Sequence, residues 1–191
     1  MKKIIKISAL AALVLTVAAC AQKEKTAAAK MSPAQECMAK TDAVRGGVFK
    51  NECIGLAFQS KTDFLYTPPA GPTQVFDMAV PKDNYSIRVM VFNNPMRDIK
   101  TPDAQKAFLA QAKKNFADRN PNLQVTKAEI ISLGNAPAVY IAASGKGRIE
   151  RHYFFNNKGQ WTQLSLNSTD KNFSTQIKPA QDALLKTVTL S

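Results

Sequence analysis

The chain has 191 residues and a formal net charge of +12, from 26 Lys and Arg against 14 Asp and Glu. This length suits one ordinary domain with short extensions. The basic residues are scattered singly and no aromatic–basic motif accompanies them, so the charge does not predict a nucleic-acid-binding protein. It fits attraction to anionic lipid headgroups or lipopolysaccharide.

The first twenty residues have the pattern of a bacterial lipoprotein signal peptide. Three lysines in the first six residues form a positive segment, and the apolar run Ile7–Ala19 follows it. This run is shorter than the ~20 residues that span a bilayer. An ordinary secretory peptide and a short uncleaved anchor are alternatives. Neither of them needs Cys20 directly after Val17-Ala18-Ala19, whereas a lipoprotein does.

Cys20 is therefore the predicted lipidation site. We expect residues 1–19 to be removed, and the Cys20 thiol and the freed amine to carry acyl chains such as palmitate. Each buried CH₂ group contributes about 0.8 kcal/mol, so two or three chains hold the protein on the membrane permanently. Residues 20–34 are small and charged, which predicts a flexible tether. Residues 35–191 are expected to form a single globular domain.

Cys37 and Cys53 form an even pair once Cys20 is lipidated. In an oxidising envelope such a pair predicts one disulfide, which in the chain-entropy model contributes about 3 kcal/mol. A metal site and a redox couple are alternatives. A metal would need further thiols or imidazoles, and the chain offers only His152. A redox couple usually has C-x-x-C spacing, so the pattern favours a disulfide and predicts no metal.

The first part of the domain has weaker signals. A short helix is predicted around Gln35–Val44, ended by Gly46-Gly47. A strand is predicted at Ile54–Gln59. Residues 61–75 contain three prolines and little periodicity, so a loop is expected there.

The middle of the domain alternates like half-buried sheet. Tyr85–Phe92 is a predicted strand with one face formed by Ile87, Val89 and Val91, and the other by Arg88, Met90 and Phe92. A helix follows, with Thr101 as its N-cap and Pro102 at its first position. It ends at Asn120-Pro121. Its sheet-facing side is predicted from residues four apart: Ala104, Phe108, Ala112 and Phe116.

Four further strands and a second helix complete the pattern. Short Gly- and Asn-containing links predict an antiparallel meander of Leu123–Leu133, Ala138–Ser144, Arg148–Phe155 and Trp161–Leu166. A C-terminal amphipathic segment follows, in which Pro179 should kink the helix or mark its start; its apolar side is Phe173, Ile177, Ala180, Leu184 and Val188. We therefore predict an α+β fold with a central antiparallel sheet and helices packed on it.

This element order resembles a known family. The helix end Arg119-Asn120-Pro121-Asn122-Leu123-Gln124-Val125, the meander SGKGRIERHYFFNNKGQWTQLSLN and the tail DALLKTVTLS are similar to DcrB lipoproteins of the PsbP-like fold. The likeness covers about residues 54–190. It implies a central antiparallel sheet between helices and a non-catalytic envelope or adaptor role, with no catalytic residues to transfer. The Cys37/Cys53 pair and the Pro-rich 67–72 loop depart from the family pattern.

Candidate catalytic residues are few. His152 alternates with Arg148 and Glu150 on one strand face, and a Glu–His pair could orient a general base. A solvated cross-strand polar face is the commoner arrangement and is expected here. Trp161, Tyr153 and Phe155 could line a ligand groove, although core packing is favoured. No catalytic residue, cofactor or metal site is predicted.

The basic residues around one hairpin are not expected to form a single patch. Lys146, Arg148, Arg151 and Lys158 lie on this hairpin and its neighbouring turn. Arg148 and Arg151 differ in strand parity, so their side chains should point to opposite faces.

Three functions are compatible with these features. The leading one is a non-catalytic binding or scaffold module for another envelope protein. The second is a carrier or sensor of a small apolar or acidic ligand held between sheet and helices. The third is a hydrolase with His152 as its candidate base. The absence of a catalytic constellation favours a binding function over an enzyme.

The residues after Cys20 predict the membrane. Ala21 and Gln22 stand where an Asp tends to retain lipoproteins in the inner membrane of Gram-negative bacteria. We expect the protein on the periplasmic face of the outer membrane. Sucrose-gradient fractionation should recover it with outer-membrane markers, and recovery with the inner membrane would contradict this prediction.

Overall fold

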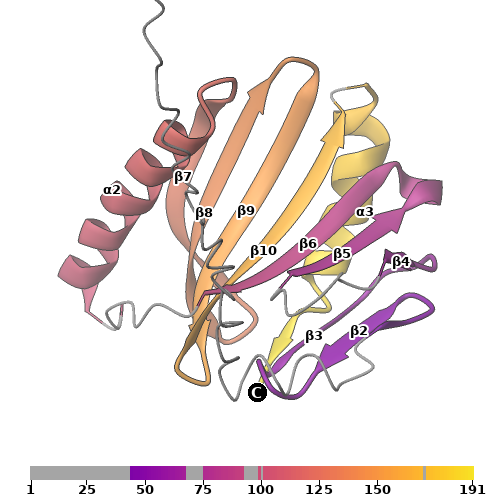
Figure 1. The fold of residues 1–191 in the computed structure, drawn as a ribbon, viewed down its shortest axis with the longest axis horizontal. Coiled ribbons are helices and arrows are strands. Elements are labelled where there is room, and N and C mark those ends of the chain that lie inside the picture. Colours follow the sequence, from indigo (N-terminus) through magenta and orange to yellow (C-terminus); the bar gives the residue numbers. More distant parts are fainter. Residues whose placement is uncertain (1–43, 68–74, 93–98, 100, 170) are drawn as a thin grey trace, which may run out of the picture. The chain divides into compact units, whose positions relative to one another are not determined.

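Two antiparallel sheets form most of the computed structural model, which describes residues 44–67, 75–92, 99, 101–169 and 171–191 (Figure 1). These residues belong to one compact unit, Met31–Ser191. The strand orders are β4-β5-β6-β10-β9-β8-β7 and β1-β2-β3-β11. The sequence predicted a single central sheet, so the second sheet is a correction. The fold is α+β, with strands outnumbering helices in the described residues. The predicted signal peptide, Cys20, the tether and Cys37 lie outside those residues.

The strands have the following bounds: β1 Val44–Arg45, β2 Val48–Asn51, β3 Leu56–Gln59, β4 Leu65–Thr67, β5 Val75–Val80, β6 Tyr85–Phe92, β7 Gln124–Leu133, β8 Ala136–Gly145, β9 Arg148–Asn157, β10 Gln160–Thr169 and β11 Thr189–Leu190. The helical segments are η1 Pro81–Asp83, α2 Pro102–Arg119, η2 Phe173–Ile177 and α3 Lys178–Leu185.

The predicted meander is confirmed, and its last three strands are longer than expected. Strands β7 to β10 have ten residues each, joined in sequence as antiparallel neighbours. Their hairpin turns take only two residues each. Lys158 and Gly159 in the last turn have φ values of 49° and 74°, the left-handed conformation that two-residue hairpins need. Strand β10 then pairs with β6, which places β10 in the interior of the larger sheet.

The N-terminal part of the domain differs from the prediction. Residues 35–43 of the predicted helix lie outside the described residues. Val44, its last predicted residue, lies in strand β1, and Gly46-Gly47 form the turn of the β1–β2 hairpin. Gly46 has a φ of 55°, which favours glycine. The predicted loop at 61–75 contains strand β4, and β5 begins at its end. Both pair into the larger sheet.

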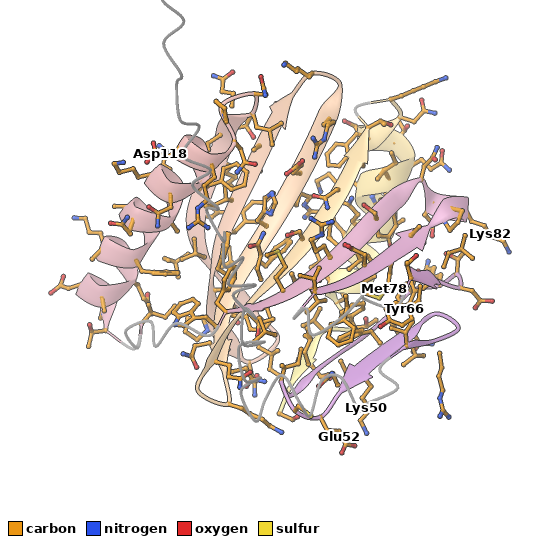
Figure 2. All side chains as sticks on the ribbon, in the orientation of Figure 1. Lys50, Glu52, Tyr66, Met78, Lys82 and Asp118 are labelled. Carbon is orange, nitrogen blue, oxygen red and sulfur yellow. The ribbon has the colours of Figure 1, made fainter. Side chains whose placement is uncertain are left out.

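The small sheet and the larger sheet share a core. The rings of Phe49 and Phe58 stack at 4.8 Å between centroids, and Phe49 also contacts Phe76 of β5 edge-to-face at 5.3 Å. Met78 and Tyr66 lie on the same side, between the larger sheet and β2–β3 (Figure 2). Each fully buried side chain of this kind contributes about 1.5–3 kcal/mol. Both sheets and α3 contribute to this core, which we call the larger core. A second, smaller core lies beneath α2.

Helices α2 and α3 lie over different parts of the larger sheet (Figure 1) and pack against separate cores. Helix α2 begins as predicted, with the Thr101 hydroxyl accepting a hydrogen bond from the Ala104 N–H at 3.2 Å. It packs on β7 and β8, where Phe116 contacts the small core that includes Val139 and Ile141. Helix α3 starts beside Pro179, after a single π-helical turn, and joins the larger core.

Gly55 lies where the meander meets the small sheet. The Asn157 side-chain N–H₂ donates to the backbone carbonyls of Ile54 and Gly55 at 2.8 and 2.9 Å. Gly55 has a φ of +63°, and a Cβ there would collide with the Ser191 carbonyl and lie 2.6 Å from the Asn157 amide nitrogen. Only glycine therefore fits this close approach.

We predict that Gly55→Ala destabilises the protein more than Gly159→Ala. Gly159 also has a left-handed φ, +74°, but a Cβ there would meet nothing within 4 Å. Gly159→Ala should cost about 1–2 kcal/mol for the backbone conformation alone, and Gly55→Ala at least about 1 kcal/mol more for the collision. Urea unfolding of both variants measures the difference, and equal losses would contradict the close approach.

Candidate ligand-binding site

A cavity of about 390 Å³ lies between α2 and the larger sheet. We call it the α2 cavity. It arises because α2 packs on β7 and β8, while the neighbouring faces of β9, β10 and β6 supply cavity-lining side chains. Typical small-molecule sites have volumes of about 300–1,000 Å³. The cavity is therefore large enough for a small ligand.

Strand alternation determines which side chains line the cavity. In β10, Trp161, Gln163, Ser165 and Asn167 face α2, while Leu164 and Leu166 enter the larger core. The register places Ser165 between Arg88 of β6 and His152 of β9. Polar residues from three strands therefore meet on one face of the sheet.

His152 is the centre of a hydrogen-bonded chain on the cavity floor. Its Nε2 lies 3.0 Å from a Glu150 carboxylate oxygen, and its Nδ1 lies 2.9 Å from the Ser165 hydroxyl and 2.9 Å from the Gln163 amide nitrogen. The amide nitrogen can only donate, so Nδ1 accepts. The proton of the neutral ring is then on Nε2, which donates to Glu150.

This arrangement corrects one expectation from the sequence. The Glu150–His152 pair was expected on a solvated strand face, but each residue is only 5% exposed. The physical reason is α2, whose Phe116 ring centroid lies 4.7 Å from that of His152. Alternation along β9 placed both residues on one face but did not show that a helix covers that face.

The Glu150 carboxylate is held as an anion. The hydrogen bond from His152 lowers the pKa of Glu150 below its ordinary value, and burial opposes this effect. An ion pair with Arg148 adds to the lowering. Glu150 thus connects His152, on the cavity floor, with Arg148, whose side chain is 62% exposed.

The order Ser165–His152–Glu150 matches the members of a catalytic triad, but the surroundings differ. The Ser165 hydroxyl belongs to a side chain that is 1% exposed. In Trp161–Ser168 of β10, each residue is paired with β6 on one side and with β9 on the other. The backbone N–H and C=O groups of this segment therefore form hydrogen bonds within the sheet. Acyl transfer needs N–H donors free to bind an oxyanion. In this series of hydrogen bonds, Ser165 is therefore better placed to hold the His152 ring in position than to act as a nucleophile.

The side chains of Arg148 and Arg151 point to opposite faces of β9, as their positions in the strand predicted. Arg148 lines the α2 cavity. Arg151 lies on the other face, where its guanidinium is 5.9 Å and 5.8 Å from the ring centroids of Tyr140 and Tyr153 and forms an ion pair with Asp182 at 2.8 Å. Arg151 therefore stabilises the packing of α3 and is separate from the cavity.

Of the three aromatic residues considered from the sequence, only Trp161 lines the α2 cavity. Its ring centroid lies 4.3 Å from that of Phe108 on α2. Tyr153 and Phe155 belong to the larger core, which confirms the core packing that the sequence favoured for them. The sequence analysis missed Gln163, Ser165 and Asn167. Their alternation with leucines in β10 was the signal that could have identified them.

The predicted disulfide between Cys37 and Cys53 is untested, because Cys37 lies outside the described residues. Cys53 is partly buried against the larger core. Within the described ranges, no group of three or more His, Cys, Asp or Glu side chains could hold a metal. In those same ranges, no helix has the length and apolar character needed to span a membrane.

No protein-family model and no curated protein matches the chain. Among solved structures it is similar to the cyanobacterial PsbP protein CyanoP from Synechocystis sp. PCC 6803, with a TM-score of 0.58 and 11% identity over 80% of this chain and 95% of that one. A Bacteroides thetaiotaomicron protein has a TM-score of 0.45 and 10% identity over 72% of this chain and 45% of its own. PA94 from Pseudomonas aeruginosa, a protein of unknown function, has a TM-score of 0.41 and 16% identity over 68% of this chain and 82% of its own. The likeness to CyanoP shows a PsbP-like fold.

We predict that Glu150→Gln reduces the loss of stability on acidification. Because the pKa of Glu150 is lowered in the folded state, its contribution is present above the ordinary carboxyl value of 4.5 and is lost as pH falls through the lowered folded value. The free energy of unfolding, measured with urea from about pH 7 down to about pH 3, should fall less steeply in Glu150→Gln than in the parent.

Glu52→Gln is the matched control. Glu52 pairs with Lys50 at 3.1 Å, but its side chain is 76% exposed (Figure 2). Exposed pairs contribute little, so this variant should keep the parental pH dependence. A parental slope in Glu150→Gln would show that the buried pair does not contribute as described.

Proposed function

We propose that this protein is a lipid-anchored, non-catalytic binding module of the bacterial cell envelope and that the α2 cavity is its binding site. The cavity is the observation that carries the proposal. It combines aromatic walls with convergent polar groups, the mixture typical of small-molecule sites. A small ligand held between sheet and helix is therefore favoured over a protein partner.

The geometry of the cavity supports a small ligand in a second way. Protein–protein interfaces bury about 800 Å² on each partner, whereas the polar groups here converge inside a concave space beneath one helix. The floor is part of a seven-stranded sheet. A floor of this kind holds its side chains in place before a ligand arrives, which lowers the entropic cost of binding.

The anchor rests on the sequence. The signal-peptide pattern, lipidation at Cys20 and the tether at residues 20–34 would hold the domain at the periplasmic face of the outer membrane. The resemblance to DcrB lipoproteins is compatible with this placement and with a non-catalytic role. In this proposal the tether lets the domain collect its ligand close to the membrane surface.

We predict that Ala112→Trp abolishes ligand binding, because Ala112 lines the α2 cavity and an indole would fill part of it. Ala107→Trp, on an exposed position of the same helix, is the matched control. Native mass spectrometry of the full lipidated chain, released from its membrane, should detect a bound small molecule in the parent and in Ala107→Trp, and none in Ala112→Trp.

Two results would overturn the proposal. One is a parent protein that carries no added mass and binds no small molecule in a metabolite and lipid screen. The other is an unchanged complex in Ala112→Trp. Circular dichroism of both tryptophan variants would confirm that they fold, so that loss of binding is assigned to the filled cavity.

A further inference from the structure

We propose that the α2 cavity selects an amphiphilic anion, with a carboxylate or phosphate group held by Arg88 and Arg148 and an apolar body placed against Phe108 and Trp161. This inference rests on the proposed function, because it names the ligand class of the same site. The shared chemistry is an acidic head on an apolar ring or chain.

The first argument is the set of hydrogen-bonding groups that the protein leaves for a ligand. The floor chain of Glu150, His152, Ser165 and Gln163 is internally paired. Two arginines in the lining keep N–H donors beyond their own ion pairs. Among the described residues, Arg88 bonds Asp77 through Nε at 2.6 Å and Nη2 at 3.1 Å. A guanidinium has five N–H donors, so Arg88 keeps others for a ligand.

Arg148 has the same property. Its Nη2 pairs with Glu150, and its side chain is 62% exposed. A ligand that binds these two guanidinium groups must bring acceptors. Carboxylates and phosphates fit because they accept parallel hydrogen bonds from a planar guanidinium.

The second argument is charge. The α2 cavity is lined by three guanidinium groups, Arg88, Arg119 and Arg148, and by one carboxylate, Glu150. Both Glu150 oxygens are engaged, one by Arg148 and one by His152. The hydrogen bond from Arg88 to Asp77 raises the pKa of Arg88, so that residue stays cationic. The lining therefore carries a positive excess that attracts an anion.

The third argument is the apolar wall of the α2 cavity. Trp161 and Phe108 both line the cavity, and their ring centroids lie 4.3 Å apart. The Trp161 indole nitrogen is itself buried, so a ligand meets the rings and not this N–H. Burial of an apolar group against the rings removes it from water, which is favourable. The wall thus favours an apolar body beside the acid group that the arginines hold.

The position of the acid group follows from a second hollow of about 550 Å³ beside the α2 cavity. Three residues line both spaces: Arg88, Arg148 and Asn167. They mark the boundary between the two hollows. An anion at this boundary contacts both arginines, and its apolar body extends beneath α2 toward the Phe108–Trp161 pair.

The test compares three probes that share a naphthalene ring: 1-naphthoate, its neutral isostere 1-naphthamide, and 1-naphthyl phosphate. Isothermal titration calorimetry on the full lipidated chain in nanodiscs, with empty nanodiscs subtracted, gives the affinities. At least one anion should bind about tenfold or more tightly than the amide. Tighter binding of the phosphate identifies phosphomonoesters, and tighter binding of the carboxylate identifies carboxylic acids.

Variants then locate the anion. Arg88→Gln should weaken the preferred anion about tenfold and leave 1-naphthamide within about twofold. Asp77→Asn removes the ion-pair partner but keeps the arginine, so anion binding should be retained or strengthened. Lys106→Gln removes a charge from α2 outside this cavity and should change neither affinity.

The outcomes separate the two proposals. If the amide binds as tightly as both anions, or if Arg88→Gln weakens all three probes equally, the anion inference is wrong. Ala112→Trp would in that case still abolish binding of every probe, and the α2 cavity would stand as the site. If Ala112→Trp leaves all three affinities unchanged, the proposed function is wrong.

Discussion

The two-sided character of β10 is the constraint on which the rest of the structure depends. This strand lies between β6 and β9 in the larger sheet, so its backbone is paired along both edges. Its side chains alternate between two surroundings, with Leu164 and Leu166 in the larger core and Ser165 beneath α2. A shift of one residue in register would move the leucines under the helix and the polar groups into the core. The apolar core thus fixes the geometry of the polar floor.

The α2 cavity exists because the two faces of the larger sheet are covered to different extents. The core face meets the small sheet and α3, and its side chains form one continuous cluster. The other face has α2, which packs on β7 and β8 through a much smaller cluster around Phe116. The polar groups of β6, β9 and β10 lie beside this contact. A second helix over β6 and β10 would have required apolar residues in their place.

The sequence was sufficient to predict elements with long periodic patterns and clear ends. The bounds of β6 and the start of α2 at Thr101-Pro102 were both predicted, and the four-stranded meander was identified from its turns. The small sheet was missed because its strands are short and because its last pairing, between β3 and β11, is not local. Thr189 of β11 pairs with Ala57 of β3, which lies more than half the chain away, and two-residue strands such as β1 have no period to detect. The burial of His152 was missed for a related reason: strand alternation shows which residues share a face, but the cover comes from another element.

Glu150 connects the floor of the cavity with its charged boundary. A buried carboxylate loses hydration, and replacing a buried ion pair with apolar residues is often neutral or stabilising. Packed apolar residues in place of the whole pair would therefore cost the fold little, whereas removing Glu150 alone leaves its partners unpaired and costs stability. What the carboxylate adds beyond stability is geometry. One carboxylate oxygen orients His152 and the other holds Arg148. Arg148 is thereby kept beside Arg88 and Asn167, where the two hollows meet. The negative charge of Glu150 is already engaged by His152 and Arg148. A ligand's acid group at this boundary would therefore meet the remaining N–H donors of Arg88 and Arg148, and the buried carboxylate beside them would already be paired.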